Sequence, residues 1–403
     1  MRIGRLVAVI LTAMCLVSCS ARTDQPDPSV SPSVPEVASP TARPSQSPES
    51  PTAAPMPTAW EQLCVVAPVN LPEASIRTAP PGEVWSDGAL TIRREGGNLV
   101  AEQNAGSYEV FSGDIDDESG VAGDVFTGAI DGNDRWVLFM SADSLNWGDP
   151  WRLHVWDRQH PGTPARIIGQ YTGKSSNPGF ALQHLRGDQA VWSEPTTTNL
   201  HRIRHADLLS GSIRTLAEGP VYAARFIHDR TVAWQTQLDD QTVAVQVFDL
   251  ETGQTSWPDN PIATMNSARG SFATDGEFWI LANVPSGDDD DDETTYDLWL
   301  WRDGWPDKKL AASLVAPAYL STGQPLSEGR LGITLQRQGA FVIDLREGIA
   351  QRVRDGWAVV EPDGATIHVA WGKAQGAKEL KVSASLPAST VAQPGECIAT
   401  LRG

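Results

Sequence analysis

The most constraining feature of this chain is a two-part unit that returns several times along it. Each copy starts at a turn with Asp or Gly and enters a short strand rich in Val and Trp. After a variable loop, a second strand ends in Asp before a Gly-containing turn. The clearest copies run from Gly187–Trp192 to Asp207–Gly211 and from His228–Trp234 to Asp249–Gly253. Other copies of the second half are Asp344–Gly348 and, more loosely, the segments at Asp157 and Asp303.

Equivalent positions of this unit are separated by 54, 41, 46, 53 and 36 residues, taking as anchors Val137, Val191, Val232, Phe278, Leu331 and Ile367. Such periods are typical of the four-stranded blades of a β-propeller. Residues 83–111 have room for one more unit, with strands expected at 89–93, 98–102 and 108–111. We therefore predict an all-β fold, a single β-propeller of about seven four-stranded blades, with six or eight blades left open.

Composition supports this fold class. The chain has 35 Gly, 29 Pro and 15 Trp but only 5 Met, which indicates many turns and large rigid apolar side chains. No amphipathic helical period is evident. Short apolar or alternating runs predict strands at 136–140, 190–192, 232–234, 243–248, 278–281, 298–301, 341–343 and 366–371.

The N-terminus has the pattern of a lipoprotein leader. Arg2 and Arg5 precede an apolar run, Leu6 to Val17, that is too short to span a membrane stably. The run ends in Leu16-Val17-Ser18-Cys19, which resembles a lipobox, so we expect a signal peptide at 1–18 and a diacylated Cys19. An ordinary cleaved leader with an incidental Cys19 is the alternative. Two or more acyl chains anchor a protein durably, which places the chain on the extracytoplasmic face of the cell membrane.

Residues 20–59 contain ten Pro and no aromatic residue. Such a segment cannot bury enough apolar surface to offset the entropy of ordering, and its prolines favour extended conformations. We predict a lipid-anchored linker over 19–59 and a folded domain over 60–403.

Two cysteines, Cys64 and Cys397, remain after Cys15 in the leader and Cys19 at the anchor. They lie near the two ends of the predicted domain, and an exported protein can form disulfides. We predict that they pair and clasp the ends of the domain where the propeller ring closes. Two buried free thiols are the alternative.

The formal net charge is −19, and removal of the leader takes away two arginines and no acid. A surface this acidic repels nucleic acid and anionic lipid headgroups. The expected partners are the membrane, through the lipid, and an envelope protein or the cell wall, with no nucleic acid.

Asp249, Thr252, Gly253 and Trp257 complete a motif that resembles the Asp-x-x-Thr-Gly-x-x-x-Trp repeat of quinoprotein-like propellers. That family includes quinone-dependent dehydrogenases and non-enzymatic outer-membrane assembly lipoproteins. The resemblance implies that Asp and Thr tie a turn between strands and that Trp packs between blades. The shorter copies keep only Asp and Gly, at Asp207 with Gly211 and at Asp344 with Gly348. With 25 Arg against 6 Lys, the chain looks like an actinobacterial-type propeller lipoprotein.

Three motifs suggest sites only weakly. His201 and His205 have a metal spacing for a helix, but on a strand they would lie about 13 Å apart. The acidic run with Asp288, Asp290 and Asp292 is a weak calcium candidate without the ligand pattern of a calcium loop. Ser141–Trp147 resembles a sialidase Asp-box but lacks its glycine. We expect no metal, no cofactor and no identifiable catalytic residue; scattered acids, namely Asp114, Asp116, Asp117 and Asp124, carry no weight as a catalytic pair.

Four tryptophans that flank expected loops are candidates for a binding face, namely Trp147, Trp151, Trp301 and Trp305. The sequence favours a non-catalytic scaffold that binds a protein or ligand in the envelope. The alternative is an extracytoplasmic enzyme or sensor for envelope sugars, lactones or quinones. A substrate-binding protein of a transporter is disfavoured, because such proteins alternate helices with strands.

Overall fold

The computed structural model describes a part of the chain that lies within the unit Met56–Gly403. The described residues are 63–113, 125–143, 150–173, 183–197, 200–239, 242–260, 262–265, 270–283, 295–303, 305, 307–315, 318–320, 326–335, 338–375, 378–393 and 395–401. The predicted leader, anchor and linker lie outside them. Among the described residues, no helix is long and apolar enough to cross a membrane.

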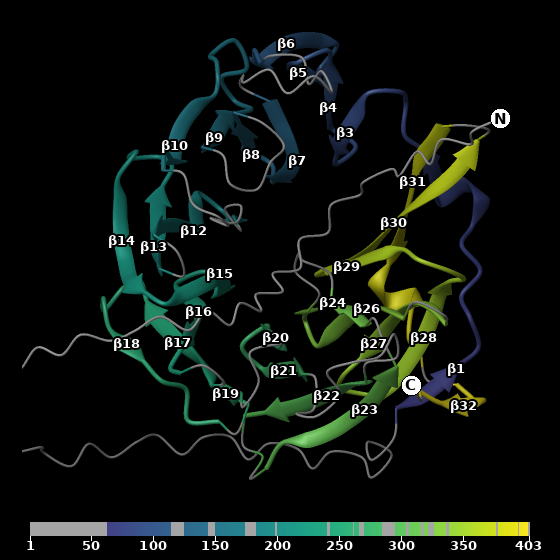
Figure 1. Cartoon of the computed structure of the whole chain (residues 1–403). Coiled ribbons are helices and arrows are strands. Elements are labelled where there is room, and N and C mark those ends of the chain that lie inside the picture. Colours follow the sequence, from purple (N-terminus) through teal and green to yellow (C-terminus); the bar gives the residue numbers. More distant parts are fainter. Residues whose placement is uncertain are drawn as a thin grey trace, which may run out of the picture. The chain divides into compact units, whose positions relative to one another are not determined.

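The described chain folds into seven sheets that follow one another in sequence order as the blades of a propeller (Figure 1). Their strands are antiparallel, apart from one N-terminal strand added in parallel to the sixth sheet. Blade 1 contains β3 (Glu83–Ser86), β4 (Leu90–Glu95), β5 (Asn98–Gln103) and β6 (Gly106–Phe111). Blade 2 contains β7 (Val125–Gly132), β8 (Trp136–Ala142), β9 (Trp151–Asp157) and β10 (Arg166–Tyr171). Blade 3 contains β11 (His184–Arg186), β12 (Gln189–Thr197), β13 (Leu200–Asp207) and β14 (Ile213–Gly219). Blade 4 contains β15 (Val221–His228), β16 (Thr231–Gln237), β17 (Val243–Asp249), β18 (Thr255–Ser256) and the added β19 (Thr264–Met265).

The remaining blades involve both ends of the described chain. Blade 5 contains β20 (Gly270–Thr274), β21 (Phe278–Asn283), β22 (Thr295–Arg302) and β23 (Lys309–Val315). Blade 6 contains β24 (Ala318–Leu320) and β25 (Leu326–Ser327), both paired with β26 (Arg330–Leu335), then β27 (Gly339–Asp344) and β28 (Ile349–Arg354). Blade 7 contains β29 (Val359–Asp363), β30 (Thr366–Gln375), β31 (Lys378–Pro387) and the N-terminal β2 (Ile76–Thr78). Single 3₁₀ turns occur at Glu73–Ser75 and Ala388–Thr390. The predicted all-β propeller of seven four-stranded blades is confirmed.

The core lies between neighbouring blades. Clusters of buried apolar side chains span blades 1 and 2, 2 and 3, 3 and 4, 4 and 5, 5 and 6, and 6 and 7. Large aromatic residues such as Trp192 and Trp234 are completely buried there. All six sequence anchors lie on the second strand of a blade, which explains why their spacing follows the blade period.

The N-terminal β2 closes the ring. It pairs with β31 through Ile76–Ala384, Arg77–Ser383 and Thr78–Val382, and so supplies the outermost strand of blade 7 before the chain enters blade 1. All three β2 residues are exposed. The last blade is therefore built from both ends of the domain.

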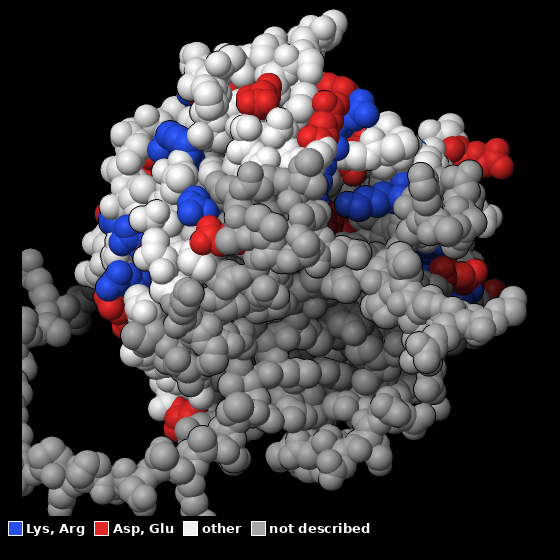
Figure 2. Space-filling model, turned by 45° about the horizontal axis from the view of Figure 1, so that its top comes forward, with Lys and Arg blue, Asp and Glu red and all other residues white. Residues whose placement is uncertain are grey.

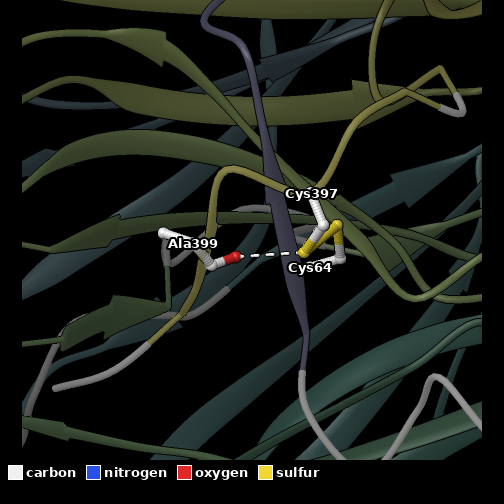
Figure 3. Close-up of a disulfide and its surroundings, with 3 residues drawn as sticks. All are labelled: Cys64, Cys397 and Ala399. Atoms are coloured by element: carbon white, nitrogen blue, oxygen red, sulfur yellow. Dashed lines mark hydrogen bonds between the residues drawn. A yellow bond between two sulfur atoms is a disulfide. The ribbon is translucent and has the colours of Figure 1, made fainter.

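The predicted pairing of Cys64 with Cys397 is present, with the two Cα atoms 5.4 Å apart (Figure 3). Cys64 begins β1 (Cys64–Val66), which pairs in parallel with β28 and antiparallel with β32 (Ala399–Thr400). Cys397 Sγ lies 3.3 Å from the carbonyl oxygen of Ala399. The expected position of the bridge was wrong. It clasps both ends onto the outer edge of blade 6, whereas the ring closes at blade 7 through β2.

Candidate functional site

The repeated Asp-to-Gly segments form the turn between the third and fourth strands of their blades. Asp249 Oδ1 accepts hydrogen bonds from the N–H groups of Glu251 and Thr252, each 2.8 Å away. The N–H of Gly253 donates to the Asp249 carbonyl, and Gly253 has φ +71°, which favours glycine. The same pattern is present at Asp207 with Gly211 and at Asp344 with Gly348.

These hydrogen bonds determine the charge state of the turn carboxylates. Backbone N–H donors lower the pKa of Asp249 and of Asp207, because they stabilise the ionised form. Each turn also bonds to the first hairpin of its blade: Leu250 N donates to Arg230 O and Leu345 N to Gly329 O. The role of these turns is structural.

Trp257 does not pack between blades as the family resemblance implied. Its side chain is 52% exposed, because β18 has only two residues and the chain leaves the sheet directly after it. Trp151 and Trp301 also depart from expectation: they are 0% and 7% exposed and belong to core clusters. Trp305 is half-buried and accepts a hydrogen bond from Trp301 Nε1 through its carbonyl. Trp147 lies outside the described residues.

The other candidate residues form no assembled centre in the described chain. His201 and His205 both lie on strand β13, as predicted. No group of three or more His, Cys, Asp or Glu among the described residues is arranged to hold a metal. The weak calcium candidates Asp288, Asp290 and Asp292 lie outside those residues, and so do Asp114, Asp116, Asp117, Asp124 and Cys19.

Ser141 and His154 form a buried pair that resembles a nucleophile with its base. Ser141 Oγ lies 2.8 Å from His154 Nε2, and the imidazole stacks on Phe139 with ring centroids 4.8 Å apart. The two residues are 0% and 5% exposed and lie between blades 1 and 2. A substrate cannot reach a hydroxyl in this position, so the pair is part of the core.

A different set of polar residues lies on the innermost strands, which face the axis of a propeller. Asp131 on β7 accepts a hydrogen bond from Leu185 N on β11, with 2.8 Å between Oδ2 and N. His184 on β11 accepts one at Nδ1 from Phe226 N on β15, at 3.1 Å. Each of these side chains thus bonds to the innermost strand of the following blade. Neither Asp131 nor His184 was predicted from the sequence as a site residue.

Acidic residues of this inner-strand set lie on blades 2 and 7. Burial raises the pKa of Asp131 to about 6 against two backbone hydrogen bonds, and the charges of Glu361 and Asp363 on β29 add to the rise. Burial also raises the pKa of Glu361, with a further contribution from Asp363. The carboxyls of blades 2 and 7 therefore influence one another electrostatically, although blade 1 separates the two blades.

Basic residues of the set lie on blades 3 and 4. Burial lowers the pKa of His184 to about 3, assisted by the charges of Arg225 and Arg186, so the imidazole is neutral. Arg225 on β15 has its pKa lowered by burial to about 10 and remains protonated at neutral pH. Its guanidinium carbon lies 5.3 Å above the ring of Phe272 on β20. Arg225 therefore contacts the innermost strand of blade 5 and is coupled electrostatically to that of blade 3.

Sequence periodicity did not reveal these residues because polar side chains scattered over the innermost strands form no regular pattern. The sequence feature that these residues share is their distance from a turn. The turn into the second strand of a blade follows two to four residues after Asp131, Arg225 and Glu361. This spacing identifies them only once the innermost strands are known.

Similarity to known proteins is found among solved structures. No protein-family model matches the chain, and no curated protein sequence does. Among solved structures, the β-propeller domain of the Trilobed protease from Pyrococcus furiosus is similar with a TM-score of 0.48 and 11% identity, over 66% of this chain and 82% of that one. An oligogalacturonate lyase in complex with manganese gives 0.47 and 12%, over 78% and 91%. TolB from Acinetobacter baumannii gives 0.36 and 12%, over 70% and 64%.

Proposed function

We propose that this chain is a lipid-anchored protein of the extracytoplasmic face of the cell membrane, whose propeller binds an envelope partner or ligand without catalysing a reaction. The observation that carries the proposal is the Cys64–Cys397 bridge, because structural disulfides persist in oxidising compartments outside the cytoplasm. The leader that ends at Cys19 agrees with export. The excess of Arg over Lys supports an actinobacterial-type origin.

The place where the N-terminal segment joins the propeller supports a display role. Leu63 is buried, and its carbonyl accepts a hydrogen bond from Leu401 N next to the β1–β28 pair. The described part of the chain therefore begins at the outer edge of blade 6, away from the innermost strands. This position of its first residues is compatible with attachment to an anchor through the N-terminal end.

The anchor is tested by metabolic labelling of cells with an alkyne-bearing palmitate, followed by membrane fractionation. We expect label and membrane retention for the unmodified chain and for Cys15→Ala, which removes the other leader cysteine. Cys19→Ala should lose both. Equal labelling of Cys19→Ala would overturn the lipoprotein assignment.

The binding role is tested by crosslinking in living cells, with mass spectrometry of the proteins and glycans recovered with the tagged chain. We expect a dominant envelope component with the anchored chain and a weaker yield of it with Cys19→Ala. An absence of any enriched component, together with turnover of an envelope sugar or lactone by the purified chain, would replace the binding role with an enzymatic one.

A further inference from the structure

Arg225 is a partly buried arginine that has no counter-charge among the described residues. Exterior arginines are mostly paired, as in Arg186–Asp229 at 2.7 Å and Arg230–Glu251 at 2.5 Å. On the face seen in Figure 2, basic and acidic side chains accordingly lie beside one another. The almost buried Arg158 is paired too, with Asp87 at 2.6 Å. The Arg225 side chain has neither a hydrogen bond nor an ion pair with any described residue, and its guanidinium lies over the ring of Phe272.

Arg225 stays charged although its surroundings lower its pKa to about 10, and it is able to bind an anion. Removing a guanidinium from water without a partner is costly, and arginine does not relieve that cost by losing its proton. Unlike Arg93 or Arg330, Arg225 has no side-chain nitrogen that is sealed from solvent without a partner. The guanidinium is thus half-buried, and its nitrogens remain accessible to solvent.

The backbone of β15 is distorted next to this residue. Two residues of β15, Ala223 and Ala224, stand where a regular strand has one, between the pairs Tyr222–Gln235 and Arg225–Ala233. Ala223 has φ +55°, a left-handed conformation that is unfavourable for a residue with a Cβ. Bulges of this kind redirect side chains and are frequent beside binding sites. The bulge sets the side-chain direction of the residues that follow, including Arg225.

The local charges select the kind of ligand. The groups that face Arg225 from neighbouring strands are the neutral imidazole of His184 and the aromatic ring of Phe272. The inner-strand carboxyls, Asp131, Glu361 and Asp363, lie on blades 2 and 7 instead. A guanidinium presents a planar fork of donors that matches a carboxylate or phosphate.

We propose that Arg225, positioned by the β15 bulge and by Phe272, binds the carboxylate or phosphate group of a small ligand at the innermost strands of blades 3 to 5. This inference deepens the proposed binding role and identifies the chemical group recognised. It does not depend on the lipid anchor, because the site lies entirely within the propeller.

The test is a calorimetric and thermal-shift titration of the purified full mature chain, with its disulfide oxidised. The probes are inorganic phosphate and pyrophosphate in one arm and acetate and succinate in the other, with sodium chloride at equal ionic strength as reference. We expect one arm to bind with Kd near the millimolar range and to raise Tm beyond the chloride reference. The arm that binds distinguishes phosphate from carboxylate recognition.

Variants locate the binding. Arg225→Gln should weaken it at least tenfold, and Arg225→Lys, which keeps the charge without the planar fork, should weaken it less. Arg214→Gln is the matched control, since Arg214 also lies over a phenyl ring, 5.7 Å from Phe248, but on the outer strand β14. It should bind as the unmodified chain does.

A second measurement uses the unmodified chain, so its result does not depend on whether a variant folds. The Nε–Hε signal of Arg225 in the unmodified chain, observed by NMR, should shift on titration with the anion that binds. The inference is overturned if neither arm exceeds the chloride reference, if Arg225→Gln retains full affinity, or if the Arg225 signal is unmoved. A crosslinked envelope partner found alongside such a result would leave the binding role standing and remove only the anion site.

Discussion

Arg77 on β2 and Glu83 on β3 form a two-pronged ion pair that joins blade 7 to blade 1. The Glu83 side chain is 6% exposed and that of Arg77 is 46% exposed. Among the described residues, no cluster of buried apolar side chains spans these two blades, although one spans each of the other six neighbouring pairs. The ring therefore closes by strand pairing and by charge, where the other blade boundaries are held by apolar packing.

Arg77→Ala should lower the free energy of unfolding by about 1–3 kcal/mol, because it leaves the buried Glu83 carboxylate without its charged donors. Urea unfolding measures the change. Arg93→Ala is the control: Arg93 pairs with Glu102, whose side chain is 44% exposed, and should cost less than about 1 kcal/mol. Adding Glu83→Gln to Arg77→Ala should recover part of the loss. Equal effects of Arg77→Ala and Arg93→Ala would show that the pair adds nothing to closure.

Gly332→Ala should destabilise the boundary between blades 6 and 7. A Cβ at Gly332 on β26 would lie 2.1 Å from the carbonyl oxygen of Val360 on β29, so two backbones would have to separate. Overpacking of this kind costs about 1–3 kcal/mol. A Cβ at Gly162 meets nothing within 4 Å, so Gly162→Ala is the control. Thermal unfolding that ranks Gly162→Ala as the more damaging change would contradict the packing.

Asp131→Asn should change how stability depends on pH. The pKa of Asp131 rises from 3.8 in the unfolded chain to about 6 in the folded one, so the folded state holds the proton more tightly. The resulting stabilisation is complete below about pH 3.8 and is lost as the pH rises through about 6. Above pH 6 the buried carboxylate therefore opposes folding by about 3 kcal/mol.

Asparagine retains an oxygen for Leu185 N and carries no charge. We expect Asp131→Asn to be more stable than the unmodified chain above pH 6, with the advantage vanishing towards pH 4, as measured by urea midpoints across that range. His184 acts in the opposite sense, since its stabilisation is lost as the pH falls from 6.5 towards 3, but it is present in both proteins and cancels. Asp355→Asn, at a side chain 86% exposed, is the control. A constant difference at every pH would refute the linkage.

Loss of the disulfide should lower stability by about 2–5 kcal/mol, because the bridge closes a loop between residues 333 positions apart in sequence. Cys64→Ser, Cys397→Ser and the double variant should lose similar amounts. Reductant should lower the urea midpoint of the unmodified chain and leave that of the double variant unchanged. A reductant-insensitive midpoint in the unmodified chain would mean that the bridge contributes nothing.

The two middle strands of each blade could be predicted from the sequence better than the strands at its edges. Every strand predicted from an apolar pattern, such as 232–234 and 341–343, is the second or third strand of a blade. Those strands are buried on both faces and read as apolar runs. The innermost strands carry the polar residues of the candidate site, so Arg225 interrupts the apolar pattern that would have revealed β15.

The closure of the ring could not be predicted from the hydrophobic pattern of the sequence, for a different reason. Strand β2 is three exposed residues long and becomes a strand only because β31 offers it an edge. For Trp257 the prediction was wrong in the opposite direction. The family motif predicted a buried side chain, but the two-residue strand β18 leaves it exposed.

The clasp at the edge of blade 6 has a consequence for proteolysis. A protease that cuts any loop between Cys64 and Cys397 produces two fragments that stay covalently joined through the bridge. On an anchored chain, a nicked propeller would therefore stay at the membrane. Release of the domain into the surroundings would require a cut before Cys64, or a cut within the loop together with reduction of the bridge.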